Sequence, residues 1–334
     1  MRKFSWFTVL ACLTALCALF AAASGASGAS QTKSASLIKL NVFTGSASAS
    51  FADIYVAQDE GLFAKYGLQV SQLLGSSDPA TELISGASQI SVGTPTTAYI
   101  ADAAGADIKA IYSPGSNYEA WMAPTDISGP AALKGKTIGV YSLQDLDVIY
   151  TSQMMSQYGL QPGSYTLLAV GPSNDKLAAI KAGSISAAPL YPPTNFQAAS
   201  DGLHQIFDTS QLKGGALPTL DVVSEKWATK NRATVVDFLK ALNAAHTWLF
   251  DPANKAAAIK IIEKHTQLPA ALAAKSYTLF FSKPGVNYSK AGEWSASAVQ
   301  TAEPSLIKLK LLSKNVPYAS TVDLSYLNAA KAGA

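Results

Sequence analysis

The sequence has few of the side chains on which catalytic and metal sites are usually built. Its two cysteines, Cys12 and Cys17, both lie near the amino terminus. The rest of the chain can therefore form no disulfide, no thiolate nucleophile and no cysteine metal site. The three histidines, His204, His246 and His265, are scattered and stand beside no clustered pair of acids. We therefore predict no metal site.

Arginine is almost as rare. Apart from Arg2, the only arginine is Arg232. Bidentate clamps for carboxylate, sulfonate or phosphate groups usually rely on arginine. A bound anion would here need lysine, hydroxyl or backbone N–H groups. The formal net charge is +3, and Arg2 and Lys3 supply two of the positive charges. The remaining chain is close to neutral, which argues against a nucleic-acid partner.

Short motifs of common enzymes are also missing. The sequence contains no nucleophile elbow G-x-S-x-G, no phosphate loop GxxxxGK[ST], no dinucleotide fingerprint GxGxxG and no zinc motif HExxH. We predict no catalytic residue and no cofactor.

The first 29 residues have the plan of a signal peptide. Arg2 and Lys3 precede an apolar run, 4–20, and small residues follow it, with Ala23, Ala26 or Ala29 as the last residue removed. This plan predicts a periplasmic or secreted protein. Two alternatives are lipid anchoring at Cys12, which the long apolar run beyond it disfavours, and a retained anchor, for which the run is slightly short.

The stretch from Asp53 to Val70 reads as a helix, a glycine stop and a strand, and this plan recurs from Asp147 to Leu168. A strand pattern precedes each copy, and each copy is followed by a helix that runs through a glycine into another strand. Two such units predict an α/β fold with two lobes built alike. The chain beyond residue 224 is mostly helical, with helices expected over 232–250 and 293–312, and too few strands remain for a third sheet.

Aromatic residues gather near the predicted strand ends and turns, with a few acids beside them. They are Phe51, Tyr55, Tyr99, Tyr112, Tyr118, Trp121, Tyr141 and Tyr191, with Asp78, Glu119 and Asp145 nearby. Aromatic rings with few acids suit a flat, uncharged or amine-bearing ligand. Taken singly, each of these rings is more often a core residue.

Four segments carry a family resemblance: AQDEGLFAKYGLQV (57–70), ELISGASQISVG (82–93), LKGKTIGV (133–140) and EKWATKNRATVVDFLKALNAA (225–245). In this order they resemble the substrate-binding proteins of ABC importers for nitrate, sulfonates, taurine and thiamine-pyrimidine precursors. The resemblance covers the chain from about Leu37 to its end. It departs from the family where Tyr141 to Asp145 replaces a Gly-Ser-rich loop, and where Tyr191-Pro192-Pro193 replaces Trp-Glu-Pro.

The resemblance implies a two-lobe periplasmic-binding fold, type II-like, with two hinge crossings and the helical carboxy-terminal tail on the first lobe. The expected first lobe comprises 37–122 and 222–334, the second lobe 127–217, and the crossings 119–127 and 214–223. The implied function is non-enzymatic delivery of a small molecule to an ABC permease driven by a separate ATPase. We expect a monomer.

Family ligand loops and the aromatic cluster together predict a ligand site between the lobes. Its candidate residues are Ser46, Ser50, Phe51, Ser76, Ser77, Asp78, Thr94, Thr96, Tyr118, Glu119, Trp121, Tyr141, Ser142, Gln144, Asp145 and Tyr191.

A heteroaromatic or amine-bearing ligand is favoured because no arginine lies near the candidate site residues, whereas Asp78, Glu119 and Asp145 are among them. A sulfonate-, taurine- or nitrate-type anion held by N–H groups and hydroxyls is the alternative. Two further alternatives are an exported hydrolase that uses Asp145 and Glu119 as acid and base, and a ligand sensor that docks on a receptor. The related pyrimidine synthases depend on a cysteine-rich motif that this chain lacks.

Overall fold

A computed structural model describes residues 36–333, apart from 214–215, 283–287, 290–291 and 301. The predicted signal peptide lies outside the described residues. Within them, no helix has both the length and the apolar character needed to cross a bilayer.

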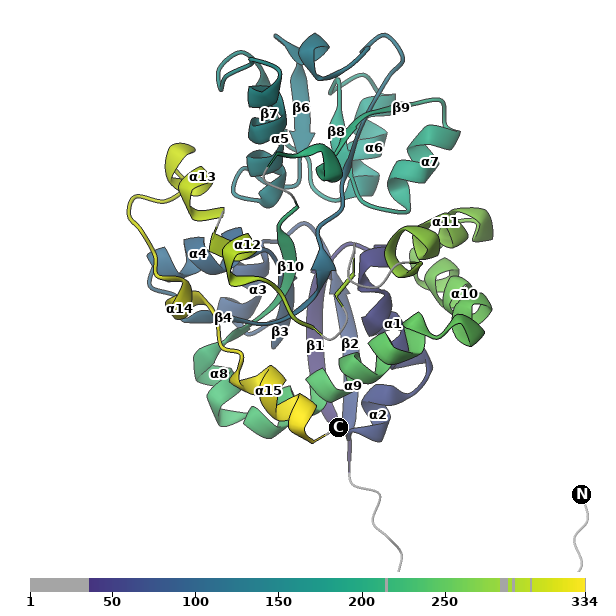
Figure 1. The fold of residues 1–334 in the computed structure, drawn as a ribbon, viewed down its shortest axis with the longest axis vertical. Coiled ribbons are helices and arrows are strands. Elements are labelled where there is room, and N and C mark those ends of the chain that lie inside the picture. Colours follow the sequence, from purple (N-terminus) through teal and green to yellow (C-terminus); the bar gives the residue numbers. More distant parts are fainter. Residues whose placement is uncertain (1–35, 214–215, 283–287, 290–291, 301, 334) are drawn as a thin grey trace, which may run out of the picture. The chain divides into compact units, whose positions relative to one another are not determined.

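The first lobe is built on a five-stranded sheet with the order β2-β1-β3-β10-β4 (Figure 1). Its strands, in that order, are Leu68–Leu74, Ile38–Gly45, Ile90–Gly93, Pro218–Ser224 and Ile108–Ser116. β1 is parallel to β2 and β3, whereas β10 runs antiparallel to both of its neighbours. The helices α1 (Ala52–Asp59), α2 (Leu62–Lys65), α3 (Pro79–Ser85) and α4 (Pro95–Ala103) connect the strands of this lobe.

The second lobe repeats this order with two smaller sheets. Parallel strands β6 (Thr137–Val140) and β7 (Thr166–Ala169) form one sheet, and the antiparallel strands β8 (Ala188–Leu190), β5 (Ala120–Ala123) and β9 (His204–Asp208) form the other. A bridge between Ile138 and Ala187 joins them, so the combined order is β7-β6-β8-β5-β9. Each strand thus has a counterpart at the same place in the first lobe, as the internal repeat predicted. The helices here are α5 (Leu146–Gln157), α6 (Ser173–Lys181) and α7 (Thr194–Ser200).

Two stretches of chain connect the lobes, and strand pairing places them differently from the expected ranges. The first connects β4 to β5 over 117–119, because β5 pairs with β8 and β9 of the second lobe. The expected first crossing, 119–127, therefore contains a second-lobe strand. The second crossing connects β9 to β10 over 209–217, because β10 belongs to the first sheet from Pro218 onward. The expected range, 214–223, overlaps that strand.

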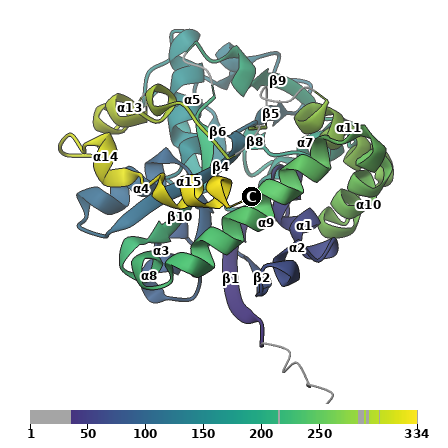
Figure 2. The ribbon, with the colours of Figure 1, turned by 60° about the horizontal axis from the view of Figure 1, so that its bottom comes forward.

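The tail consists of helices that pack mainly on the first lobe (Figure 2). They are α8 (Glu225–Lys230), α9 (Arg232–Phe250), α10 (Lys255–Thr266), α11 (Ala270–Phe281), α12 (Ala296–Gln300), α13 (Ala302–Lys308), α14 (Tyr318–Thr321) and α15 (Ser325–Ala332). α9 has the predicted bounds. The expected bounds of the helix over 293–312 are wrong at both ends: helical residues begin at Ala296 and end at Lys308, and Lys310 has a left-handed φ of 59°.

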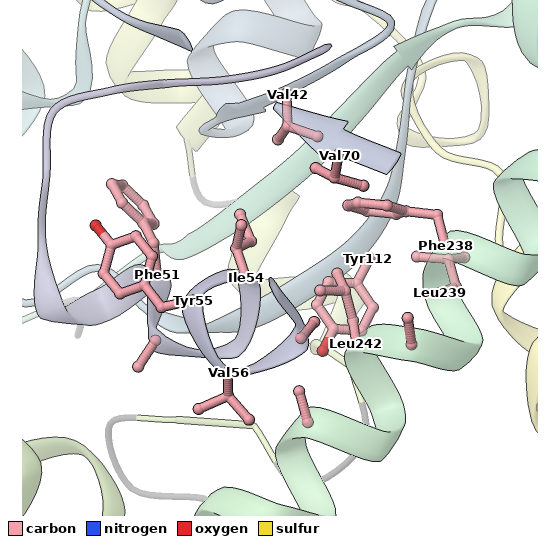
Figure 3. Packing of buried hydrophobic residues seen from close by; sticks show 14 of the residues in the cluster. Val42, Phe51, Ile54, Tyr55, Val56, Val70, Tyr112, Phe238, Leu239 and Leu242 are labelled. Carbon is pink, nitrogen blue, oxygen red and sulfur yellow. The ribbon is translucent and has the colours of Figure 1, made fainter. Parts of the chain in front are cut away.

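Apolar packing in the core of the first lobe holds α1 in place, and α1 directly follows the predicted ligand residues Ser50 and Phe51. α1 packs against α9, and its Ile54 belongs to a buried apolar cluster that also includes Val42 of β1, Val70 of β2 and Phe238 of α9 (Figure 3). Ile54 is 2% exposed and Val42 and Phe238 are fully buried. Burial of this kind stabilises the fold by about 1.5–3 kcal/mol for each large side chain. The amino terminus of α1 is therefore held rigidly.

Candidate functional site

A narrow pocket lies between the lobes, with a volume of about 60 Å³. Both lobes and the first crossing supply its walls. It is lined by Phe43, Thr44, Gly45, Ser46, Ser50, Phe51, Pro79, Val92, Gly93, Thr94, Thr97, Asn117, Tyr141, Asp145, Tyr191 and Thr219. Sites for drug-sized ligands typically measure roughly 300–1,000 Å³, so this arrangement suits a compact ligand.

Direct hydrogen bonds hold the two lobes together around the pocket. The Tyr141 hydroxyl donates to the carbonyl oxygens of Gly75 and Ser77, each 2.9 Å away. On another side, Ser48 Oγ donates to the Pro192 carbonyl at 2.8 Å, and the Ala49 N–H donates to the same oxygen at 3.1 Å. Because each bond joins residues of different lobes, the structure represents a closed arrangement.

Asp145 presents a carboxylate at the pocket from the amino terminus of α5. Its Oδ1 accepts a hydrogen bond from the Leu146 N–H at 2.6 Å, as an N-cap residue does. Removal from bulk water, followed by the negative charge of Asp147, raises the pKa of Asp145 to about 7. The backbone bond and Lys176 act in the opposite direction without cancelling these effects. Asp145 therefore changes charge near neutral pH.

Glu119 lies in the first crossing and is fully buried. Neither of its carboxylate oxygens has a hydrogen-bond partner among the described residues. Burial raises the pKa of Glu119 well above its usual range, and the charge of Asp147 raises it further. A buried carboxylate without a partner favours its protonated form, or a cation placed beside it.

The lysine closest to this cluster is already paired. Lys176 Nζ lies 2.7 Å from Asp147 Oδ2, and both side chains are fully buried. The same Asp147 oxygen accepts the Tyr141 N–H at 2.8 Å. Lys176 Nζ is also 5.8 Å from the centre of the Tyr191 ring. Glu119, Asp145 and Asp147 thus share one cation, and Asp145 is the only charged side chain among the pocket-lining residues.

Seven predicted residues line the pocket: Ser46, Ser50, Phe51, Thr94, Tyr141, Asp145 and Tyr191. Thr96 lies directly behind it, with its hydroxyl 2.6 Å from that of Thr94. Ser77 contributes only its carbonyl oxygen to the interlobe contact, and Ser76 is its neighbour at the loop. Tyr118 is partly buried against the cores of both lobes.

Other predicted residues have local or separate roles. The Asp78 carboxylate caps α3 through the Ala80 N–H at 2.8 Å, and Ser142 Oγ accepts the N–H of Gln144 at 3.3 Å. Asp78 and Gln144 line a separate cavity of about 160 Å³ beside α3 and α4.

Trp121 differs from its expected position. It is fully buried on β5, its ring packs edge-on against Phe207 at 5.7 Å, and its indole N–H donates to Thr151 Oγ1 at 3.2 Å. It belongs to the core of the second lobe and does not line the pocket.

Sequence reasoning missed several lining residues: Phe43, Thr44, Gly45, Pro79, Val92, Gly93, Thr97, Asn117 and Thr219. Asn117 is the most informative, because its Nδ2 donates to the Tyr191 hydroxyl at 3.0 Å. It belongs to the first crossing, and a correct location of that crossing would have pointed to it.

A family model described as "NMT1/THI5 like" matches residues 48–256 of the chain. The chain belongs to the NMT1/THI5-like family. This match covers more than half of the sequence and confirms the resemblance given by the sequence motifs. The comparison with curated protein sequences found no match.

Solved structures share the fold of this NMT1/THI5-like chain at low sequence identity. The alkanesulfonate-binding protein SsuA from Xanthomonas axonopodis pv. citri, bound to MOPS, is 21% identical, with 85% of this chain and 98% of that chain covered and a TM-score of 0.71. The periplasmic nitrate-binding protein NrtA from Synechocystis PCC 6803 is 14% identical, with 89% of each chain covered and a TM-score of 0.76.

An enzyme shares the fold as well. The desulfurization enzyme DSZB is 13% identical, with 89% of this chain and 99% of that chain covered and a TM-score of 0.66. These likenesses establish the two-lobe periplasmic-binding fold for this NMT1/THI5-like chain.

Proposed function

We propose that this NMT1/THI5-like chain is the exported solute-binding component of an ABC importer. It captures a compact, amine-bearing organic molecule in the interlobe pocket and delivers it to a membrane permease driven by a separate ATPase. The family membership and the fold shared with SsuA and NrtA support the transport role.

The choice of an amine-bearing ligand rests on the distribution of charge around the pocket. Asp145 is the only charged residue among the described residues that line it, and Glu119, which has no hydrogen-bond partner among those residues, lies in the adjoining crossing. A protonated amine beside Asp145 would supply the missing positive charge. The charge-assisted hydrogen bond formed in this way is about twice as strong as a neutral one.

Aromatic rings and hydroxyls complete the proposed recognition. Tyr141, Tyr191 and Phe51 line the same pocket, and ring faces attract cations by about 0.5–2 kcal/mol each. The hydroxyls of Ser50 and Thr94 would bind other polar atoms of the ligand.

An anion of the sulfonate or nitrate type is the second candidate. The names of SsuA and NrtA favour it, as do the lining hydroxyls, including Ser46 and Thr94 at the amino terminus of α4. The single charged lining residue opposes it, because an ionised Asp145 repels an anion.

Thermal-shift screening distinguishes the two candidates. A ligand present at 100 times its dissociation constant stabilises the folded state by about 2.7 kcal/mol. We expect raised melting temperatures with primary amines such as ethylamine and benzylamine. Methanesulfonate and nitrate, which carry no amine, should have no effect. Stabilisation by sulfonates alone would refute the amine assignment, and Asp145→Asn provides the matched variant for which the amine response should be lost.

The binding role is proposed to be non-enzymatic. The position of Glu119 supports this proposal, because it is buried in the first crossing and is not among the described residues that line the pocket with Asp145. Mass spectrometry of the ligand before and after incubation checks this, and any turnover would favour the hydrolase alternative. A kinase gene in place of permease genes beside the coding sequence would favour the sensor alternative.

A further inference from the structure

A second cavity of about 230 Å³ lies between α5 of the second lobe and α13 of the tail. None of its lining residues belongs to the interlobe pocket. α13 also contacts α4 of the first lobe, so the cavity is bordered by elements anchored in different lobes.

One face of α5 forms the polar wall of this cavity. Ser152, Gln153, Ser156 and Gln157 recur at intervals of three and four residues, which places them on the same side of the helix. Hydrogen bonds fix two of these side chains. Gln153 Nε2 donates to Ser305 Oγ on α13 at 3.4 Å, and Gln157 Oε1 accepts the backbone N–H of Lys213 at 2.8 Å.

Of the described residues, two lysines line the cavity and no acid does. Lys213 comes from the second crossing and Lys308 from the end of α13. Among the described residues, neither has a carboxylate within ion-pair distance, in contrast to Lys176, Lys181 and Lys264. Hydroxyl and amide groups beside two unpaired ammonium groups make an environment that favours negative charge.

We propose that this cavity is a second ligand site, which takes a small organic anion with one or two carboxylate or phosphate groups. The ammonium groups of Lys213 and Lys308 bind the charged ends, and the serine and glutamine side chains of α5 hydrogen-bond to the remaining oxygens. The opposite charge of the interlobe pocket, where Asp145 is the charged residue, makes the two sites selective for different ligands.

The experiment is isothermal titration calorimetry with succinate and with inorganic phosphate, using protein purified after expression of the full chain. We expect saturable binding below about 10 mM for at least one of the two anions. Succinamide, which has the same carbon skeleton without charge, should not bind. The double variant Lys213→Gln/Lys308→Gln should lose about tenfold or more in affinity, because two charge-assisted contacts are removed.

Lys314→Gln is the matched control, since Lys314 is an exposed lysine of the tail that does not line the cavity. It should leave the affinity unchanged, and all variants should retain the melting temperature of the wild type. The absence of binding, equal binding of succinamide or an unchanged affinity of the double variant would each overturn the proposal. If Asp145→Asn, and not the double variant, changes anion binding, the anion occupies the interlobe pocket. That result would also overturn the amine assignment, whereas a failure of the second site alone would leave it intact.

Discussion

The affinity for a cationic ligand should depend on pH through Asp145. Its pKa of about 7 means that the carboxylate is ionised only in part at neutral pH. A protonated amine binds the ionised form, and an alkylamine keeps its own charge across the range from pH 5 to 8. Affinity should therefore rise with pH up to about 7 and level off above it.

The size of this effect follows from the ionised fraction. With a pKa of about 7, roughly 90% of Asp145 is ionised at pH 8 and roughly 1% at pH 5. The affinity should fall by about 90-fold between these two values. Replacing Asp145 with Asn should remove the pH dependence and weaken binding at pH 8 by roughly 1.5–3 kcal/mol, the usual contribution of a hydrogen bond to a charged group.

Calorimetric titrations with benzylamine at pH 5, 6, 7 and 8 would measure this dependence. Repeating them in buffers of different ionisation enthalpy would count the proton released on binding. An affinity that is constant over this range, or that increases toward pH 5, would refute the reasoning; the second result is the one expected for an anionic ligand.

The same shift has the opposite consequence for the stability of the ligand-free protein. The folded state keeps a proton on Asp145 that the unfolded state, with an ordinary pKa of 3.8, has already released. The contribution of this group to stability is therefore fully present below about pH 4 and is lost as the pH rises to about 7.

Three further substitutions test the surrounding structure. Tyr141→Phe removes the hydroxyl that bonds the two lobes, so small-angle scattering should show a more open protein and ligand affinity should fall by about 1 kcal/mol. Lys176→Met leaves the buried Asp147 without its lysine partner and should lower the free energy of unfolding, measured in urea titrations, by about 3–5 kcal/mol. The double variant Lys176→Met/Asp147→Leu removes both charges and should recover much of this loss. Gly292 has a φ of +71°, and the methyl group added by Gly292→Ala would meet the buried ring of Tyr112 on β4. Gly61→Ala is the control, because Gly61 has a similar φ of +67° but open space around it. Gly292→Ala should lower the free energy of unfolding by at least about 2 kcal/mol more than Gly61→Ala does.

Local chemistry made several elements predictable from the sequence. Ser77 or Asp78 as a cap, followed by Pro79 at the first helical position, predicts a helix start, and α3 begins there with Asp78 as the cap, because these signals act within a few residues of the chain. Similarly, the periodic apolar pattern of 232–250 fixed both ends of α9.

The features that could not be predicted from the sequence depend on the pairing of strands that are far apart in the chain. The aromatic ring of Trp121 is buried because β5 pairs with β9, whose Phe207 is distant in sequence. A strand of four residues is too short for its alternation to indicate which side faces a ligand. Asn117 lies in the first crossing and Thr219 at the start of β10, and both line the pocket at places that depend on where the chain passes from one sheet to the other.

The order of strands also has a consequence for how the chain folds as it emerges. All five strands of the second lobe lie between Ala120 and Asp208, whereas the first lobe needs β10 between β3 and β4 to complete its sheet. Before residue 224 has emerged, the first lobe exposes the edges of two strands that later pair with β10. The second lobe can close earlier, although it begins later in the sequence. Amino-terminal domains usually fold first during synthesis, but here we expect the second lobe to fold before the first. The first lobe is therefore the part that needs protection from aggregation during synthesis and export.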